Sequence, residues 1–168
     1  GSKSIVLFQI NPDTGSLNQV DVLDGLGPNE NQPMQFTIEA GFSNDSKFIY
    51  ALDPSYGTSG AVNNLGIDED TLQGFKTNTG ENASIRFARG ISCKTNLRWI
   101  YVTSDDASTL TVLSRDKETG RTKIAKVYRD GTEGIRGLGG AFAVACSPDG
   151  RFIYTSSGRF HGDDTIGV

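Results

Sequence analysis

The sequence has little of several features that would identify a class of protein. No run approaches the roughly 18 consecutive apolar residues of a membrane-spanning helix, so no membrane span is expected. Runs of helix-forming residues are scarce, and hydrophobic residues make up 36% of the 168 positions, which is somewhat low for a globular domain. Glycine, in contrast, is abundant, at 21 positions. This composition is typical of short strands separated by many polar turns.

An excess of positive charge is also absent. The formal net charge is −4, whereas a nucleic-acid-binding protein usually presents a basic face. The loose group of basic residues between Lys117 and Lys126 includes Glu118 and follows Asp116. We therefore expect a solvated pair of strands there, and no nucleic-acid partner.

Three segments of the sequence repeat one another without gaps. They are Phe42–Tyr50, Cys93–Tyr101 and Cys146–Tyr154, spaced by 51 and 53 residues. Each reads as the end of a strand, a polar turn, a basic residue and then an aromatic residue followed by Ile-Tyr. The turn is clearest before Arg151, where proline presets φ, aspartate caps the turn and Gly150 tolerates a positive φ. The residues after each turn are of types that favour strands.

A second pair of segments repeats in the same frame. Ile5–Gly15 matches Leu110–Gly120 at a separation of 105 residues. One unit of about 52 residues then contains four strands joined by hairpin-like turns, and such a meander buries its faces only by stacking on its neighbours. The sequence therefore predicts an all-β chain, a β-propeller of about three four-stranded antiparallel blades.

The repeats also set expectations for the domain and its assembly. Residues 1–168 are expected to be a single propeller segment, with a cloning-tag remnant at 1–3 and approximate repeats at 4–60, 61–107 and 108–164. Propellers use at least about four blades. The chain is therefore expected to be a partial propeller, or half of a ring that a second copy completes as a six-bladed dimer. Against simple closure, Ile5–Ile10 and Thr165–Val168 match the same strand of the repeat.

Three segments of the sequence resemble those of a known family. Ala143–Tyr154 and Val112–Gly120 resemble the repeat of the YVTN and lactonase-like β-propellers, the 6-phosphogluconolactonase-like propellers among them, and Arg129–Ala141 is similar to the glycine-rich bridge between their blades. The resemblance implies a propeller. It implies less about function, because some relatives are sugar lactonases and many are scaffolds or binding modules on secreted bacterial proteins.

The first group of candidate binding residues lies in the loop that holds the single histidine. Its members are Arg159, His161, Asp163 and Asp164. His161 could act as a general base or metal ligand with an aspartate beside it. The simpler interpretation is a polar loop, and one histidine does not supply a recognisable catalytic set. No catalytic residue and no cofactor is therefore assigned.

A second group of candidates comes from the middle repeat. Asp105 and Asp106 occupy the loop equivalent to Asp163 and Asp164. Carboxylates in turns can bind Ca²⁺, but the spacing matches no known calcium loop, so turn capping is the simpler role and no metal is assigned.

Two basic residues complete that second group. Arg86 and Arg89 lie on or near an innermost strand. They are expected either to line the central channel, where propeller ligands often bind, or to form ion pairs between blades.

The cysteines occupy equivalent positions in neighbouring repeats. Cys93 and Cys146 are expected to be reduced, buried and inert, because equivalent points on adjacent blades usually lie too far apart for a disulfide. The sequence therefore favours a non-enzymatic scaffold or binding module for a protein or carbohydrate ligand, within a larger extracellular or surface protein. The alternatives are a lactonase-like hydrolase fragment and a purely architectural spacer.

Overall fold

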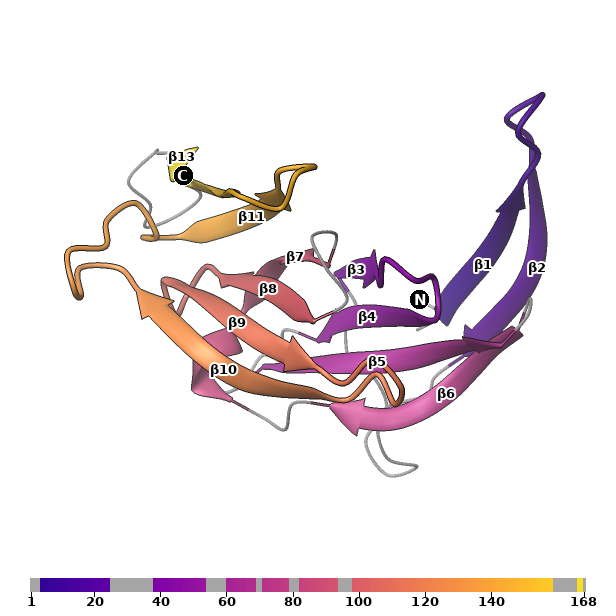
Figure 1. The fold of residues 1–168 in the computed structure, drawn as a ribbon, viewed down its shortest axis with the longest axis horizontal. Coiled ribbons are helices and arrows are strands. Elements are labelled where there is room, and N and C mark those ends of the chain that lie inside the picture. The colour runs from indigo at the N-terminus through magenta and orange to yellow at the C-terminus, as the bar shows by residue number, and fades with distance from the viewer. Residues whose placement is uncertain are drawn as a thin grey trace.

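The chain is an all-β partial propeller built from small antiparallel sheets (Figure 1). The computed structural model describes residues 4–24, 38–53, 60–68, 71–78, 82–93, 98–158 and 166–167. In this part of the chain, the helical element is a single 3-10 turn, η1 (Ala83–Ile85). None of the described helices is long and apolar enough to cross a membrane.

The sheets follow one another along the chain. The N-terminal hairpin is a two-stranded sheet of β1 (Ser4–Ile10) and β2 (Leu17–Asp24). The first blade has four strands: β3 (Glu39–Phe42), β4 (Phe48–Asp53), β5 (Ala61–Asp68) and β6 (Thr71–Asn78). The second blade also has four: β7 (Ala88–Ser92), β8 (Trp99–Ser104), β9 (Thr109–Arg115) and β10 (Thr122–Arg129). The third blade has three in the described residues: β11 (Ala141–Cys146), β12 (Ile153–Ser157) and β13 (Ile166–Gly167).

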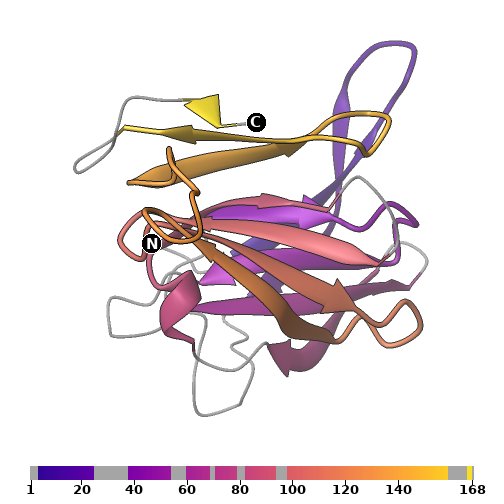
Figure 2. The same ribbon diagram turned by 60° about the vertical axis from the view of Figure 1, so that its left-hand side comes forward.

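Consecutive strands of each blade pair antiparallel, so each blade is the meander that the repeat predicted. Figures 1 and 2 both show the third blade lying beside the second. Figure 1 shows it across the molecule from the turn of the N-terminal hairpin. The first and second blades each have four strands in the described residues.

The turns between the first two strands of the first and third blades have the same hydrogen bonds. In the first blade, the Ser43 hydroxyl accepts from the Phe48 N–H at 3.0 Å and donates to Asp45. In the third blade, Ser147 makes the matching bonds to Phe152, also at 3.0 Å, and to Asp149. The repeat found in the sequence is therefore a repeat of turn geometry.

The residue that closes this turn has a positive φ in both blades. Gly150 has φ 71°, as the sequence predicted, and Ser46 has φ 57° at the equivalent place. Glycine adopts a positive φ without steric cost, whereas for serine the same φ raises the conformational free energy of the folded chain.

The second family of turns repeats as closely as the first. Between β1 and β2, the Asn11 side chain accepts from the backbone N–H groups of Asp13 and Thr14. Between β9 and β10, the Asp116 carboxylate accepts from the N–H groups of two residues at the same spacing. Both turns end in a glycine with φ near +70°, which supports the predicted match of the two segments 105 residues apart.

Alternate residues of β4 face opposite neighbours. Phe48, Tyr50 and Leu52 belong to a buried cluster shared with the second blade, whereas Ile49 and Ala51 belong to one that also packs against the N-terminal hairpin. Residues Phe48–Leu52 of the strand are apolar or aromatic because both of its faces are buried, as expected for a sheet packed between two others. The second blade contributes Ile85, Ala88, Ile91, Cys93, Ile100, Val102 and Leu113.

The second and third blades approach closely at Gly90. A Cβ at this position would lie 2.8 Å from the Phe142 carbonyl oxygen, so only glycine fits between β7 and β11. The Thr103 hydroxyl donates to that same carbonyl at 3.1 Å. These contacts fix the position of the third blade relative to the start of β7, where the predicted arginines lie.

Candidate functional site

The structure brings four of the predicted residues together at one end of the second blade. The Arg86 guanidinium pairs with the Asp106 carboxylate, and Arg89 Nε lies 3.7 Å from Asp105 Oδ2. The arginines flank the start of β7, and the aspartates follow β8. We call these four residues the Arg–Asp cluster. Both ion pairs form within one blade, so the alternative expectation of ion pairs between blades is wrong for these residues.

Local hydrogen bonds hold the arginine side of the cluster in place. Asn82 caps the start of η1, and its side chain accepts from the Ser84 N–H at 2.8 Å. The hydroxyls of Thr109 and Thr111 donate to the Ser84 carbonyl, and the Ser104 hydroxyl donates to the Arg86 carbonyl. The chain entering β7 is therefore anchored on β8 and β9 of its own blade.

The backbone on both sides of the cluster has an unfavourable conformation. Phe87, between the two arginines, has φ 50°, and Ser108, in the turn after Asp106, also has φ 50°. Positive φ at residues other than glycine costs free energy and concentrates at functional sites. The Asp105 N–H donates to the Phe87 carbonyl at 3.3 Å, which links the two segments.

The cluster extends onto the third blade. The Arg89 guanidinium lies over the Phe142 ring, 5.9 Å from its centroid, in a cation–π contact. Its Nε is buried and has no hydrogen-bond partner in the part of the chain that the structure describes, so it contacts Asp105 through charge at 3.7 Å. Arg86 and Asp106 are more exposed than Arg89 and Asp105. The cluster thus offers one guanidinium and one carboxylate to solvent, above a second, more buried pair.

The other predicted group is not placed. Arg159, His161, Asp163 and Asp164 lie outside the described residues. Within the described ranges, no group of three or more His, Cys, Asp or Glu residues could hold a metal ion.

Both cysteines are free thiols. Cys93 is buried, and burial together with the nearby Cys146 raises the pKa of its thiol to about 12. The Ser92 hydroxyl donates to the Cys146 sulfur at 3.1 Å. A thiol with so high a pKa is a poor nucleophile at neutral pH, so Cys93 acts as a small apolar side chain in the core.

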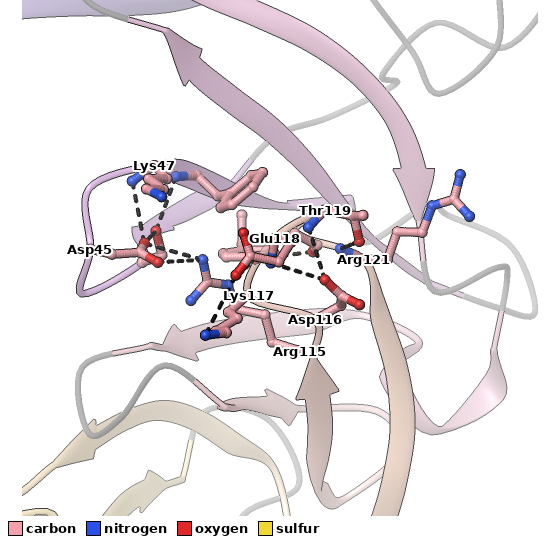
Figure 3. A network of polar contacts seen from close by, with 12 residues as sticks. Asp45, Lys47, Arg115, Asp116, Lys117, Glu118, Thr119 and Arg121 are labelled. Atoms are coloured by element: carbon pink, nitrogen blue, oxygen red, sulfur yellow. Dashed lines mark hydrogen bonds and ion pairs between the residues drawn. The ribbon is translucent and has the colours of Figure 1, made fainter.

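A polar network that the sequence did not predict joins the first and second blades (Figure 3). It lies at the end of the second blade opposite the Arg–Asp cluster. Arg115, at the end of β9, donates through Nη2 to both carboxylate oxygens of Asp45, at 2.8 and 3.1 Å. Its Nε donates to the Tyr50 hydroxyl at 2.8 Å, and that hydroxyl donates to the Gly120 carbonyl at 3.0 Å. The Arg115 side chain is only 2% exposed.

Charge and burial act against each other in this network. Burial tends to raise the pKa of Asp45, but hydrogen bonds from Ser43, from Arg115 and from the Lys47 backbone outweigh it and hold that pKa below its usual value. Burial alone tends to lower the pKa of Arg115, and the bonds to Asp45 and Tyr50 raise it instead. Both residues are therefore held charged, and the network links the first blade to the second.

Solved structures provide the comparison for the whole fold. The chain is similar to the periplasmic gluconolactonase PpgL of Pseudomonas aeruginosa, with a TM-score of 0.64 and 20% identity over 91% of this chain and 43% of that one. It is also similar to a Bacteroides uniformis protein with the provisional name 6-phosphogluconolactonase, with a TM-score of 0.62 and 18% identity over 90% of this chain and 42% of that one. A Lactobacillus plantarum protein matches with a TM-score of 0.62 and 17% identity, over 98% of this chain and 50% of that one.

The chain has the fold of the lactonase-like β-propellers. It spans half or less of the length of each of these structures. No known protein family and no curated protein matches the sequence. The comparisons therefore support the propeller architecture that the repeats predicted.

Proposed function

We propose that this chain is part of a lactonase-like propeller hydrolase that opens a sugar lactone with water at the Arg–Asp cluster. The observation that carries the proposal is the convergence of two carboxylates and two guanidiniums where β7 begins, beside Phe142 of the third blade. Among the three alternatives drawn from the sequence, the hydrolase has more support than the scaffold, because structures of similar fold carry lactonase names.

The chemistry needs a base for water and positive charge for the carbonyl oxygen. The more exposed carboxylate, Asp106, takes a proton from a water molecule, and the resulting hydroxide attacks the lactone carbonyl carbon. A guanidinium, from Arg86 or Arg89, stabilises the negative oxygen of the tetrahedral intermediate. The ring C–O bond then breaks, the leaving oxygen regains a proton, and the product is the open-chain hydroxy acid.

A second candidate function, a carbohydrate-binding module, rests on a different feature of the same cluster. Each carboxylate already has an arginine beside it, and a neutralised pair can donate and accept hydrogen bonds to sugar hydroxyls without supplying a base. An architectural spacer has less support, because charged groups gather at one end of the second blade.

Lactone hydrolysis tests the proposal directly. The purified chain is given gluconolactone or 6-phosphogluconolactone, and acid release above the uncatalysed rate is measured at constant pH. Asp106→Asn is expected to lower kcat by about 100-fold, the lower end of the usual contribution of a general base. Asp13→Asn, which removes the same charge from an exposed turn at the opposite end, is the matched control.

The outcome separates the two candidates. Turnover that falls with Asp106→Asn and persists with Asp13→Asn supports the hydrolase. Saturable sugar binding by calorimetry without turnover, lost in Arg86→Ala, supports the binding module. Turnover that survives Asp106→Asn contradicts the assignment of the base.

A further inference from the structure

The two arginines of the Arg–Asp cluster have different partners. The Arg86 guanidinium forms a direct ion pair with the Asp106 carboxylate. Arg89 Nε lies 3.7 Å from Asp105 Oδ2, which is close enough for attraction between charges but too long for a hydrogen bond. The two guanidiniums are therefore not interchangeable. One is joined to the carboxylate that would act as the base, and the other is held mainly by charge.

The Nε–H group of Arg89 is a buried donor without an acceptor. Among the residues described, no hydrogen-bond partner reaches Arg89 Nε. Most buried polar groups in proteins are hydrogen-bonded, and a donor on a charged group is among the most costly to leave unpaired. In a candidate site, an exception of this kind indicates an acceptor that arrives with the ligand.

The third blade holds the Arg89 side chain without using its donors. Cζ of Arg89 lies 5.9 Å from the centroid of the Phe142 ring. Such a cation–π contact engages the positive charge with the face of the ring and requires no hydrogen bond from an N–H group. The guanidinium is thus held in place while its Nε–H group can still donate to a ligand.

The Phe142 ring belongs to a strand that is packed tightly against the strand carrying Arg89. A Cβ on Gly90, the next residue, would lie 2.8 Å from the Phe142 carbonyl oxygen and 2.9 Å from Ala143 Cα. The Thr103 hydroxyl donates to the same carbonyl at 3.1 Å. These contacts fix β11 against β7, so the guanidinium and the ring are arranged before any ligand binds, as the stabilisation of a transition state requires.

The charge around Arg89 favours an acceptor that is neutral before the reaction. Asp105, whose side chain is only 10% exposed, already balances the guanidinium. A carboxylate or phosphate bound at Arg89 would place another negative charge beside Asp105, and like charges repel more strongly where water is scarce. A carbonyl oxygen carries no full charge until hydroxide adds to its carbon.

We propose that Arg89 is the catalytic residue that receives the lactone carbonyl oxygen, and that Phe142 of the third blade is its positioning residue. Arg89 Nε donates to this oxygen as it becomes negative in the tetrahedral intermediate. When the ring C–O bond breaks, the oxygen becomes part of a carboxylate, which Asp105 repels. The site therefore selects the neutral lactone over the anionic acid that it forms. This inference rests on the proposed hydrolysis for its chemistry and on the surroundings of Arg89 for the choice of residue.

Steady-state kinetics on gluconolactone test the role of Arg89. Arg89→Lys keeps a positive charge near Asp105 but replaces the planar guanidinium by a flexible ammonium group. It is expected to lower kcat by about 100-fold, the lower end of the usual effect of removing one donor from an oxyanion site. KM should change by less than about threefold, because the bond strengthens only in the transition state. Arg86→Lys, with a cation still beside Asp106, should lower kcat by a smaller factor.

Two variants and a matched control test the positioning role of Phe142. Phe142→Leu removes the ring and should lower kcat by about tenfold with little change in KM, the size of effect expected from a cation–π contact. Phe142→Tyr keeps a ring and should restore most of kcat. The control is Phe152→Leu, because Arg151 lies over that ring at 5.4 Å, at the other end of the β11–β12 hairpin. It should leave kcat unchanged.

Binding of gluconate, the product acid, gives a measurement that does not need turnover. In calorimetric titrations, Asp105→Asn should lower the dissociation constant for gluconate by about tenfold or more, because the Arg89 charge is then no longer balanced. Adding Arg89→Lys to Asp105→Asn should remove this gain. Asp13→Asn, which removes the same charge from an exposed turn, should leave the dissociation constant as it is in the parent chain.

The results separate this inference from the proposed hydrolysis. Turnover that survives Arg89→Lys overturns the role of Arg89 and leaves the hydrolase in place. Equal losses of kcat from Phe142→Leu and Phe152→Leu overturn the positioning role of Phe142. No turnover by the parent chain, combined with tighter gluconate binding by Asp105→Asn, contradicts the hydrolysis and supports Arg89 as the donor to the ligand. Gluconate binding that Asp105→Asn does not tighten overturns the selection for a neutral ligand.

Discussion

Asp45→Asn and Arg115→Met should destabilise the chain unequally, although they break the same ion pair. Asp45→Asn leaves the Arg115 guanidinium charged and 2% exposed, and an unpaired buried charge costs about 3 kcal/mol or more. Arg115→Met leaves Asp45, whose side chain is 18% exposed and still bonded to Ser43 and to the Lys47 N–H. Losing only a charged hydrogen bond should cost about 1.5 kcal/mol.

Urea unfolding at one fixed protein concentration measures both values, and the double variant completes the cycle. The double variant should be close to Arg115→Met alone, because methionine fills the space and neither residue is left charged. Equal losses from the two single variants, or a larger loss from Arg115→Met, would refute the claim that desolvation of the guanidinium dominates the network.

The same pair makes stability depend on pH. The pKa of Asp45 is lower in the folded chain than its ordinary value, so its contribution is fully present above the unfolded pKa of about 3.9. It is lost as the pH falls from there through the folded pKa, because the unfolded chain binds the proton more readily. Asp45→Asn should therefore flatten the fall in unfolding free energy below about pH 4 relative to the parent chain.

The remaining predictions concern turns. Gly15 and Gly120 share φ near +70°, but a Cβ at Gly120 would lie 2.4 Å from the Phe48 ring and one at Gly15 meets nothing within 4 Å. In thermal unfolding, Gly15→Ala should cost about 1 kcal/mol for the backbone alone, and Gly120→Ala roughly 1–3 kcal/mol more; equal costs would show that this hairpin does not press on Phe48. Ser46→Gly should raise stability by about 0.5 kcal/mol, because removing the strain of φ 57° exceeds the entropy that glycine adds to the unfolded chain; a loss of stability would contradict the φ assigned there.

The candidate site was only partly predictable from the sequence. Arg86, Arg89, Asp105 and Asp106 were identified as candidates from their place in the repeat, but their pairing was not, because it depends on η1 and on the turn after β8 meeting at one end of the blade. The strained φ of Phe87 leaves no mark in the sequence, since phenylalanine at that position gives no turn signal.

The network around Arg115 and Asp45 shows more clearly what the sequence could not predict. Arg115 and Asp45 are 70 residues apart, and in the sequence each belongs to a different strand-and-turn pattern. The contact forms only because the turn after β3 lies against the end of β9, and this depends on how the two blades stack.

The sequence by itself determined the repeat, the four-stranded meander and the turns, because these depend on local φ preferences and on residues close together in the chain. The tertiary structure alone decided which faces are buried. Phe48 and Tyr50 of β4 have their equivalents in Phe152 and Tyr154 of the third blade, yet the first two are covered by the second blade and the last two are exposed. Burial of a blade's face depends on which neighbour packs on it, and no single repeat contains that information.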